Sequence, residues 1–216
     1  MSTETEHRGL FVAVEGPDGS GKSTQARALV AALRAAGREA VLTREPGGSD
    51  LGETLRGLLL DPAHAPVDPR TEALLFAAAR AAHAVRTLRP ALARGAVVVT
   101  DRYVDSSVAY QGAVRGLGEE WIARLNDWAT DSLVPDLTVL IDVDAATAAA
   151  RRTGRDGDGA DRMEQETADQ HEALRAAFLA RAAAAPERYL VLDGALDPEE
   201  LTARALARVT AEADAR

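Results

Sequence analysis

Five short apolar runs recur along the chain, each bounded by polar or turn-forming residues. They span residues 10–14, 40–43, 96–100, 137–141 and 189–192 and are rich in Val and Leu. Short runs of this kind, bounded by turn signals, are typical of strands that are buried on both faces of a parallel sheet. The pattern therefore predicts a sheet of five strands.

The segments between these runs are rich in Ala and Leu and favour helices. We expect helices over residues 24–33, 51–60, 70–93, 118–132, 145–152, 164–184 and 197–212. Strands that alternate with helices form crossovers that cover a parallel sheet on both faces. The predicted fold class is α/β, with one domain over residues 9–216 behind a disordered tail at residues 1–8. Ligands are expected at the carboxyl ends of the strands.

The first apolar run leads into residues 16–23, Gly-Pro-Asp-Gly-Ser-Gly-Lys-Ser. This is the G-x-x-x-x-G-K-[ST] pattern, placed between a predicted strand and a predicted helix as a phosphate-binding P-loop requires. Its backbone N–H groups are expected to surround phosphate oxygens at the helix N-terminus. We expect Lys22 to reach the β- and γ-phosphates and Ser23 to ligate Mg²⁺. Lys22 is also the only lysine among 25 basic residues, at the position where a P-loop needs a flexible ammonium group.

The third apolar run ends in Asp101 and Arg102. An Asp directly after a strand is typical of nucleotide sites, where it holds Mg²⁺ directly or through water. Arg102 offers a planar pair of donors for a second phosphate. Asp142 and Asp144 follow the fourth run in a similar way. We prefer Asp101 because an arginine suited to phosphate adjoins it, whereas Asp142 or Asp144 can cap the next helix.

Two loops have both a plain and a functional interpretation. Residues 43–48, Thr-Arg-Glu-Pro-Gly-Gly, form a Pro-Gly turn and also suit contact with a phosphate and a ribose. Residues 151–162 hold four arginines and three aspartates among flexible glycines. That segment suits a solvated loop, but beside a P-loop it predicts a mobile lid whose arginines close over the transferred phosphoryl group. An arginine in that role is worth on the order of 10³–10⁵ in rate.

Two helical pairs also have alternative interpretations. Phe76 and Arg80 are four residues apart and share a helix face; taken alone, Phe76 suits the core and Arg80 the surface. Trp121 and Trp128 are seven residues apart and share a face of another helix. We interpret these tryptophans as core or subunit-interface residues.

Composition excludes several classes of function. The net charge of the 216 residues is −9 without a basic stripe, which argues against binding to a nucleic-acid polymer. The chain has no Cys, hence no disulfide or thiolate metal site, and it shows neither a membrane-spanning run nor a signal peptide. These features fit a cytoplasmic protein. A GTPase N-K-x-D element is impossible because the single lysine lies in the P-loop.

Taken together, residues 15–23, 43–48, 75–80, 101–103 and 106–112 resemble thymidylate kinase of the bacterial type. The resemblance covers about residues 9–212, with all motifs in order. It implies phosphoryl transfer from ATP to dTMP, giving dTDP, with Mg²⁺. It also implies the P-loop fold of the nucleoside monophosphate kinases, with a five-stranded parallel sheet and a lid at about residues 151–162, and a homodimer.

The resemblance assigns the acceptor nucleotide to a set of side chains. Phe76 matches a residue that stacks on thymine, and Arg80 matches one that hydrogen-bonds the base. Ser107 and Gln111 match positions that read the base edge. Tyr110 matches a residue against the deoxyribose, where it would disfavour a 2′-hydroxyl. This interpretation replaces the plain one for Phe76 and Arg80.

The resemblance likewise implies the phosphate contacts. Arg102 and Arg56 match residues on the dTMP side, chiefly at its phosphate, and Glu15 and Glu45 match acidic residues near the acceptor phosphate, the sugar and Mg²⁺. The catalytic set comprises Lys22, Arg102, Arg155, Arg151 and Glu15, and the metal set comprises Ser23 and Asp101. Residues expected at the ATP phosphates are Gly16, Pro17, Asp18, Gly19, Ser20, Gly21, Lys22, Ser23, Thr24 and Arg152.

Position 19 separates two subtypes of this family. The eukaryotic form carries an arginine inside the P-loop, whereas Gly19 matches bacterial enzymes with the catalytic arginine in the lid. Arg155 is the first choice for that role, followed by Arg151 and Arg152, and Arg162 would fix the exit of the lid. The turn at residues 192–195 is a weak candidate for contact with adenine. Alternatives are a kinase for another nucleoside monophosphate and a nucleotide-binding regulator without turnover.

Overall fold

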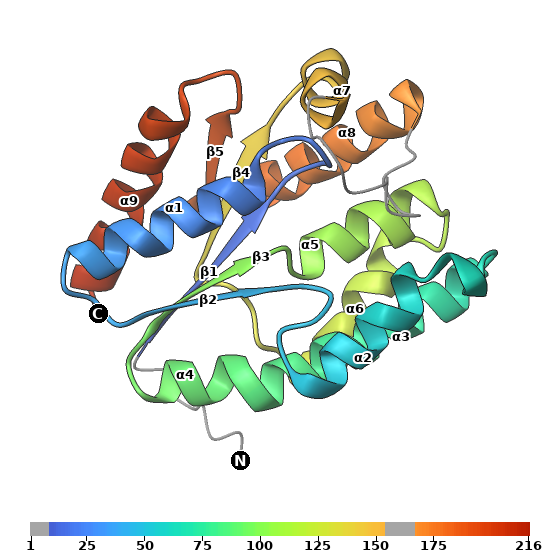
Figure 1. Ribbon diagram of the computed structural model, residues 1–216, viewed down its shortest axis with the longest axis horizontal. Helices are drawn as coiled ribbons and strands as arrows, with labels where there is room; N and C mark the ends of the chain where they lie inside the picture. Colours follow the sequence, from blue (N-terminus) through green and yellow to red (C-terminus); the bar gives the residue numbers. More distant parts are fainter. Residues whose placement is uncertain (1–8, 154–166) are drawn as a thin grey trace.

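The computed structural model describes residues 9–153 and 167–216 and contains the predicted five-stranded parallel sheet (Figure 1). The strand order is β2-β3-β1-β4-β5, so β1 lies at the centre and pairs with both β3 and β4. The strands are β1 (Leu10–Glu15), β2 (Ala40–Arg44), β3 (Val97–Asp101), β4 (Leu137–Asp142) and β5 (Tyr189–Asp193).

Nine α-helices are present in the described residues. They are α1 (Lys22–Ala35), α2 (Asp50–Leu60), α3 (Pro69–His83), α4 (Arg89–Ala93), α5 (Val104–Ser107), α6 (Glu119–Thr130), α7 (Ala145–Thr153), α8 (Ala168–Ala184) and α9 (Pro198–Asp214). Short 3₁₀ turns occur at η1 (Pro62–His64) and η4 (Pro186–Arg188). The first residues of the helix predicted over 164–184 lie outside the described residues.

Two π-helical segments were not predicted. The helix expected over residues 70–93 contains one of them, η2 (Ala84–Leu88), between α3 and α4. The other, η3 (Val108–Val114), continues α5 in a region for which no helix was expected. Such segments are rare and frequently lie at functional sites. Here η3 carries Tyr110 and Gln111, two of the residues that the family resemblance assigns to the acceptor nucleotide.

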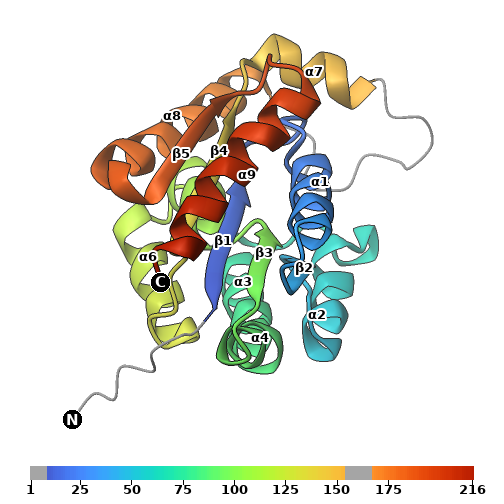
Figure 2. The ribbon, with the colours of Figure 1, turned by 90° about the vertical axis from the view of Figure 1, so that its left-hand side faces the viewer.

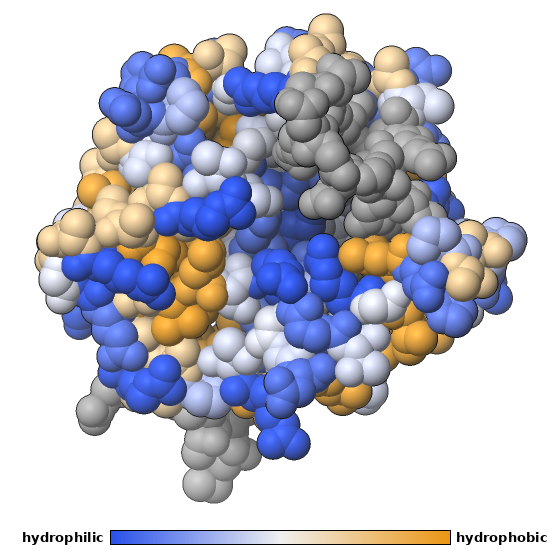
Figure 3. Space-filling view, in the orientation of Figure 1, coloured by the Kyte–Doolittle hydropathy of each residue, from blue (hydrophilic) through white to orange (hydrophobic). Residues whose placement is uncertain are grey.

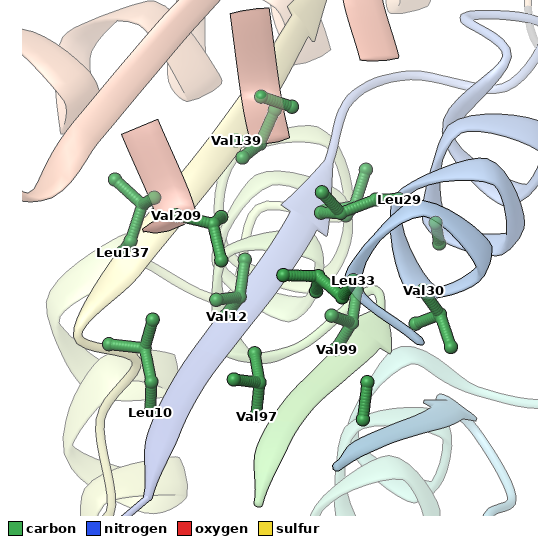
Figure 4. Packing of buried hydrophobic residues seen from close by; sticks show 14 of the residues in the cluster. Leu10, Val12, Leu29, Val30, Leu33, Val97, Val99, Leu137, Val139 and Val209 are labelled. Carbon is green, nitrogen blue, oxygen red and sulfur yellow. The ribbon is translucent and has the colours of Figure 1, made fainter. Parts of the chain in front are cut away.

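The alternating side chains of β1 divide the core between the two faces of the sheet. Leu10, Val12 and Val14 pack with residues of α1 and α9 (Figure 4). Figures 1 and 2 both show α9 beside α1 on that face. Phe11 and Ala13 pack on the other face against η2 and α4. Because both faces of β1 are buried, its residues 10–14 are all apolar, and only its last residue, Glu15, is charged.

Local signals explain where several helices begin. Pro69 is the first residue of α3, and the Asp68 carboxylate accepts the N–H groups of Arg70 and Thr71. Thr167 and Gln170 form a capping box at α8. No helix in the described ranges has the length and apolarity needed to cross a bilayer.

The topology determines where a ligand can bind. The connections from the neighbouring strands β1 and β3 run in opposite directions, since β1 connects to β2 at one edge of the sheet and β3 connects to β4 on the other side of β1. Crevices at the carboxyl ends of strands form at such a switch point. The P-loop, the loop after β2 and the turn after β3 all start at this edge, which positions the candidate site.

Candidate functional site

The P-loop backbone at the end of β1 has the conformation of an anion site. Gly16, Gly19 and Gly21 have φ values of 146°, 87° and 93°, which favour glycine. A Cβ at Gly19 would lie 2.4 Å from the carbonyl oxygen of Ala148 on α7, so no side chain fits there without a shift. Gly21 precedes α1 without a side-chain cap, which leaves N–H groups of the first turn available to an anion.

Asp18 joins the two cations of the phosphate region. Its carboxylate accepts a hydrogen bond from Lys22 Nζ at 3.0 Å, from the Tyr110 hydroxyl at 2.9 Å and from Arg102. Burial opposes ionisation, but the charges of Arg102 and Lys22 outweigh it and hold the pKa of Asp18 well below its usual range. Asp18, Lys22 and Arg102 therefore form one cluster of fixed charge at the P-loop.

Arg102 is held in an unusual backbone conformation at the end of β3. Its φ is 70°, a left-handed value that is rare for residues other than glycine. The guanidinium donates to Ser106 Oγ at 2.7 Å and to the Gly16 carbonyl at 3.3 Å, and it lies 5.1 Å from the centre of the Tyr110 ring. These contacts direct Arg102 toward the P-loop, where backbone strain is typical of functional residues.

Asp101 and Ser23 have the properties of magnesium ligands. Both line the same cavity, and the buried Oδ1 of Asp101 has no hydrogen-bond partner among the described residues. Within those residues, no group of three His, Cys, Asp or Glu side chains converges. Two oxygen donors beside a phosphate site fit Mg²⁺, which usually keeps several waters and binds through few protein groups and substrate phosphates.

The other carboxylates after strands have different partners. Arg175 donates to both oxygens of Asp142, at 2.7 and 2.9 Å. Asp144 accepts the N–H of Thr147 at 2.7 Å and caps α7. Asp142 and Asp144 thus have protein partners, and the choice of Asp101 as the magnesium ligand stays a prediction.

Arg80 lies at the opposite end of the cavity and is 2% exposed. Its guanidinium donates to Glu45 at 2.5 Å, to Ser107 Oγ at 3.1 Å, to the Tyr103 carbonyl at 3.2 Å and to the Asn126 side chain. The interpretation of Arg80 as a surface residue is therefore wrong. Four hydrogen bonds fix the guanidinium plane and leave it little freedom to reorient.

His83 extends this network. Its Nδ1 lies 2.9 Å from Glu45 Oε1, and its Nε2 lies 2.7 Å from Thr43 Oγ1. Glu45 thereby bridges His83 and Arg80, and all three side chains are buried. The loop after β2 is thus anchored to α3 through its acidic residue.

Phe76 and Gln111 complete this end of the cavity. Phe76 is half-buried and lines the cavity, so it is not a core residue. Gln111 on η3 is buried, and its Nε2 donates to Glu72 Oε1 at 3.0 Å. Arg56 also lines the cavity and donates to the Pro46 carbonyl at 2.9 Å.

Glu15 lies behind the turn that follows β3 rather than in the main cavity. Its carboxylate accepts the N–H groups of Tyr103 and Ser106 at 2.7 and 3.2 Å and the Ser106 hydroxyl at 2.6 Å. Burial, with a contribution from Asp105, raises the pKa of Glu15 to about 7. Glu15 lines a separate cavity. In this arrangement Glu15 positions the turn that carries Arg102, and its place near the acceptor phosphate stays a prediction from the resemblance.

Arg151 connects the P-loop to the turn at residues 192–195. It donates to the Ser20 carbonyl at 3.2 Å and to the Gly194 carbonyl at 2.7 Å. Both bonds go to backbone, and Arg151 does not line the main cavity. Arg155 and Arg162 lie outside the described residues, as does the side chain of Arg152.

A single cavity of about 270 Å³ contains most of the predicted site. Figure 3 shows its mouth as a hollow among hydrophilic side chains. It brings together residues from the P-loop and from β2, β3, α2, α3, α5 and η3. Predicted residues that line it are Asp18, Gly21, Lys22, Ser23, Glu45, Arg56, Phe76, Arg80, Asp101, Arg102, Ser107, Tyr110 and Gln111.

Comparisons with known proteins agree with this geometry. Residues 14–205 match the family model described as thymidylate kinase. This chain belongs to the thymidylate kinase family. It is 52% identical to the thymidylate kinase of Clavibacter sepedonicus, over 93% of this chain and 94% of that protein. It is 49% identical to the Leifsonia xyli enzyme, over 97% and 98% of the two chains.

A solved structure of the family is also similar. The crystal structure of thymidylate kinase from Ehrlichia chaffeensis aligns with a TM-score of 0.75 and 32% identity, over 94% of this chain and 98% of that one. The predicted fold class and the family resemblance are therefore confirmed, and the chain is a dTMP kinase by family membership.

Sequence reasoning missed several residues of this site. It placed Asp18 only at the ATP phosphates and gave no role to Glu72, His83 or Asn126. A signal existed for Glu72, because it precedes Phe76 by four residues and so shares the helix face of Phe76 and Arg80. Asn126 has no such signal, because it lies on α6, 46 residues after Arg80 in the sequence.

Proposed function

We propose that the main cavity binds dTMP and the terminal phosphates of ATP, and that Lys22 and Arg102 hold the two reacting phosphoryl groups. The observation that carries this proposal is one continuous cavity with cations at one end and an aromatic ring with buried polar groups at the other. A nucleoside monophosphate has the same division into anion, sugar and base. Membership in the thymidylate kinase family supports thymine as that base.

Positioning and charge stabilisation dominate phosphoryl transfer. Lys22 and the P-loop N–H groups neutralise the phosphates of ATP, and Arg102 presents the dTMP phosphate as nucleophile. That phosphate is already an anion near neutral pH, so no strong general base is required. Arg155, with Arg151 and Arg152 as further candidates, remains a prediction for the arginine that stabilises the transferred group.

A magnesium ion belongs to this proposal. Ser23 and Asp101 would hold it beside the ATP phosphates, and when bound it neutralises charge on the phosphate oxygens. The partnerless Oδ1 of Asp101 supports this assignment. A cytoplasmic location remains a prediction from the sequence.

The test is ADP release from Mg·ATP with dTMP, dUMP, dCMP, dGMP and UMP at equal concentration. We expect dTMP to lead and dUMP to follow, because a pocket gains only about 1–3 kcal/mol from a methyl group. UMP should be negligible because the family resemblance assigns Tyr110, which lines the cavity, to a position against the deoxyribose. A different leading nucleotide would contradict the base assignments. ATP binding without any turnover would favour the regulator instead.

We further propose that the outer faces of α2, α3 and α6 form a homodimer interface. These helices lie side by side (Figure 1), and their exposed side chains include Leu51, Leu74, Trp121 and Trp128, the last of which is 82% exposed. The core interpretation of the two tryptophans is therefore wrong. Exposed apolar patches of this kind mark interaction surfaces.

Light scattering coupled to gel filtration tests the dimer. Trp128→Glu should shift the protein toward the monomer mass, because a charge would be buried without a partner. Val134→Glu is the matched control, since Val134 is also exposed but lies in the loop before β4. A monomeric unmodified chain, or a dimer unaffected by Trp128→Glu, would contradict this interface.

A further inference from the structure

A buried carboxylate accepts a hydrogen bond from the Gln111 amide. Glu72, in the first turn of α3, is 1% exposed, and its Oε1 accepts the Nε2 group of Gln111 at 3.0 Å. Gln111 is also 1% exposed and lines the main cavity. Arg115, which is partly exposed, lies 3.4 Å from the same Glu72 oxygen and supplies a counter-charge. An amide that lines the cavity is thus tied to a side chain outside the cavity.

A carboxylate at this position has a property that an amide lacks. An ionised carboxylate only accepts hydrogen bonds, whereas a glutamine side chain both donates and accepts. Glu72 therefore binds only the nitrogen of Gln111 and rejects its oxygen. A buried carboxylate is costly compared with a neutral residue of the same size, so its use here points to a requirement that a neutral residue does not meet.

The orientation of an amide matters because thymine and cytosine present opposite edges. Thymine has a donor at N3 and an acceptor at O4, whereas cytosine has an acceptor at N3 and a donor at N4. Rotation of the Gln111 amide by 180° exchanges its acceptor and its donor at the cavity. An amide free to rotate can pair with either base, and an anchored amide pairs well with one.

We propose that Glu72 is a positioning residue that fixes Gln111 in the orientation that reads thymine and rejects cytosine. This inference rests on the proposed contact between Gln111 and the base. Phe76 and Arg80 lie one and two turns further along the same face of α3, so one helix face supplies the stacking ring, the cation and the residue that orients the amide.

The test compares kcat/KM for dTMP and dCMP in Glu72→Gln. We expect the ratio of dTMP to dCMP to fall at least about tenfold, the size of one well-made hydrogen bond, with a gain in dCMP turnover. Glu120→Gln, the same change on the exposed first turn of α6, should leave the ratio unchanged. Thermal unfolding of both variants monitors the fold.

A second background separates positioning from a structural role. In Gln111→Leu the amide is absent, so adding Glu72→Gln should not change the ratio further. If Gln111→Leu leaves the ratio of the unmodified chain unchanged, Gln111 does not read the base and the inference falls with that contact. If Gln111→Leu lowers the ratio but Glu72→Gln lowers both turnovers equally, Gln111 keeps its role and only the positioning role of Glu72 is overturned.

Discussion

The two ends of the main cavity hold their charges differently. At the phosphate end, Lys22 and Arg102 share one partner, the Asp18 carboxylate, and the side chains of Asp18 and Arg102 are each 16% exposed. At the base end, Glu45, Arg80 and His83 are at most 2% exposed and contact one another or other protein groups. The phosphate end is partly open to solvent, and the base end is closed.

This difference matches the ligands that the two ends are proposed to bind. A phosphate carries its own charge, so it can take over contacts of Lys22 and Arg102 from Asp18 without leaving either cation unpaired. A base is neutral and binds through a few hydrogen bonds, so its partners must be fixed beforehand to avoid an ordering cost. We therefore expect substitutions at the phosphate end to reduce activity, and substitutions at the base end to reduce stability as well.

Lys22→Met should have the largest effect. Loss of the ammonium group at the ATP phosphates is expected to lower kcat about 10³-fold, equivalent to roughly 4 kcal/mol of transition-state stabilisation. The free energy of unfolding should change by less than about 1 kcal/mol, because Asp18 keeps Arg102 and Tyr110. Coupled ADP release and urea unfolding measure the two quantities. If the free energy of unfolding fell by as much as the transition-state stabilisation, the phosphate end would not differ from the base end in its effect on stability.

Arg80→Met should reverse that pattern. It leaves the buried Glu45 carboxylate and the Asn126 side chain without one partner each, at a cost of about 3 kcal/mol in the free energy of unfolding. Arg102→Met is the matched control, because Asp18 retains Lys22 and the loss should be about 1 kcal/mol. Urea unfolding of Arg80→Met and Arg102→Met measures both losses. Similar losses in the two variants would show that burial does not distinguish these arginines.

His83→Leu tests the outer part of the base-end network. Glu45 Oε1 and Thr43 Oγ1 lose their partner, which is expected to lower the free energy of unfolding by about 2 kcal/mol. Because Arg80 still holds Glu45, KM for dTMP should rise only a few-fold. An unchanged midpoint of urea unfolding would mean that His83 is replaceable as a hydrogen-bond partner.

The last effect is a pH dependence and concerns Glu15, whose carboxylate lies below the turn at residues 103–106. Its pKa is raised from 4.5 to about 7 in the folded protein. Between these values the folded chain holds the extra proton, so the contribution of Glu15 to the free energy of unfolding decreases as pH rises, by roughly 1.4 kcal/mol per pH unit. Asp18 changes the free energy of unfolding only at lower pH. Because its pKa is lowered in the folded protein, the free energy of unfolding decreases as pH falls below 3.8, the ordinary pKa of an aspartate.

Urea unfolding at about pH 5 and about pH 7 measures this slope. Glu15→Gln cannot titrate and should flatten the dependence, although it also weakens the contacts with Tyr103 and Ser106. A slope that persists in Glu15→Gln would assign the titration to another group.

The fold could be predicted from the sequence because each strand is a short apolar run and several long helices, such as α3 and α8, begin at a capping residue. The π-helix at residues 108–114 could not, since nothing local distinguishes it from a loop. Its conformation depends on contacts such as those of Tyr110 with Asp18 and of Gln111 with Glu72, over 92 and 39 residues.

The residues of the site also divide into those that a local pattern indicates and those whose place depends on distant contacts. The P-loop and the Asp101-Arg102 pair are local patterns that follow strands, so sequence alone placed them at the sheet edge. The buried partners of Arg80 and the place of Glu15 depend on packing between distant elements. No local pattern indicates that the turn at residues 103–106 lies over the Glu15 carboxylate and supplies two N–H groups.

The single lysine has a practical consequence. An endoprotease that cleaves only after lysine has one target in this sequence, the bond after Lys22, and would yield residues 1–22 and 23–216. In the folded protein that bond lies in the first turn of α1, directly after a buried lysine. Cleavage therefore requires local or global opening, and its rate reports how often the phosphate loop opens. Nucleotide should slow this single cut, which provides a binding assay that needs no label and no turnover.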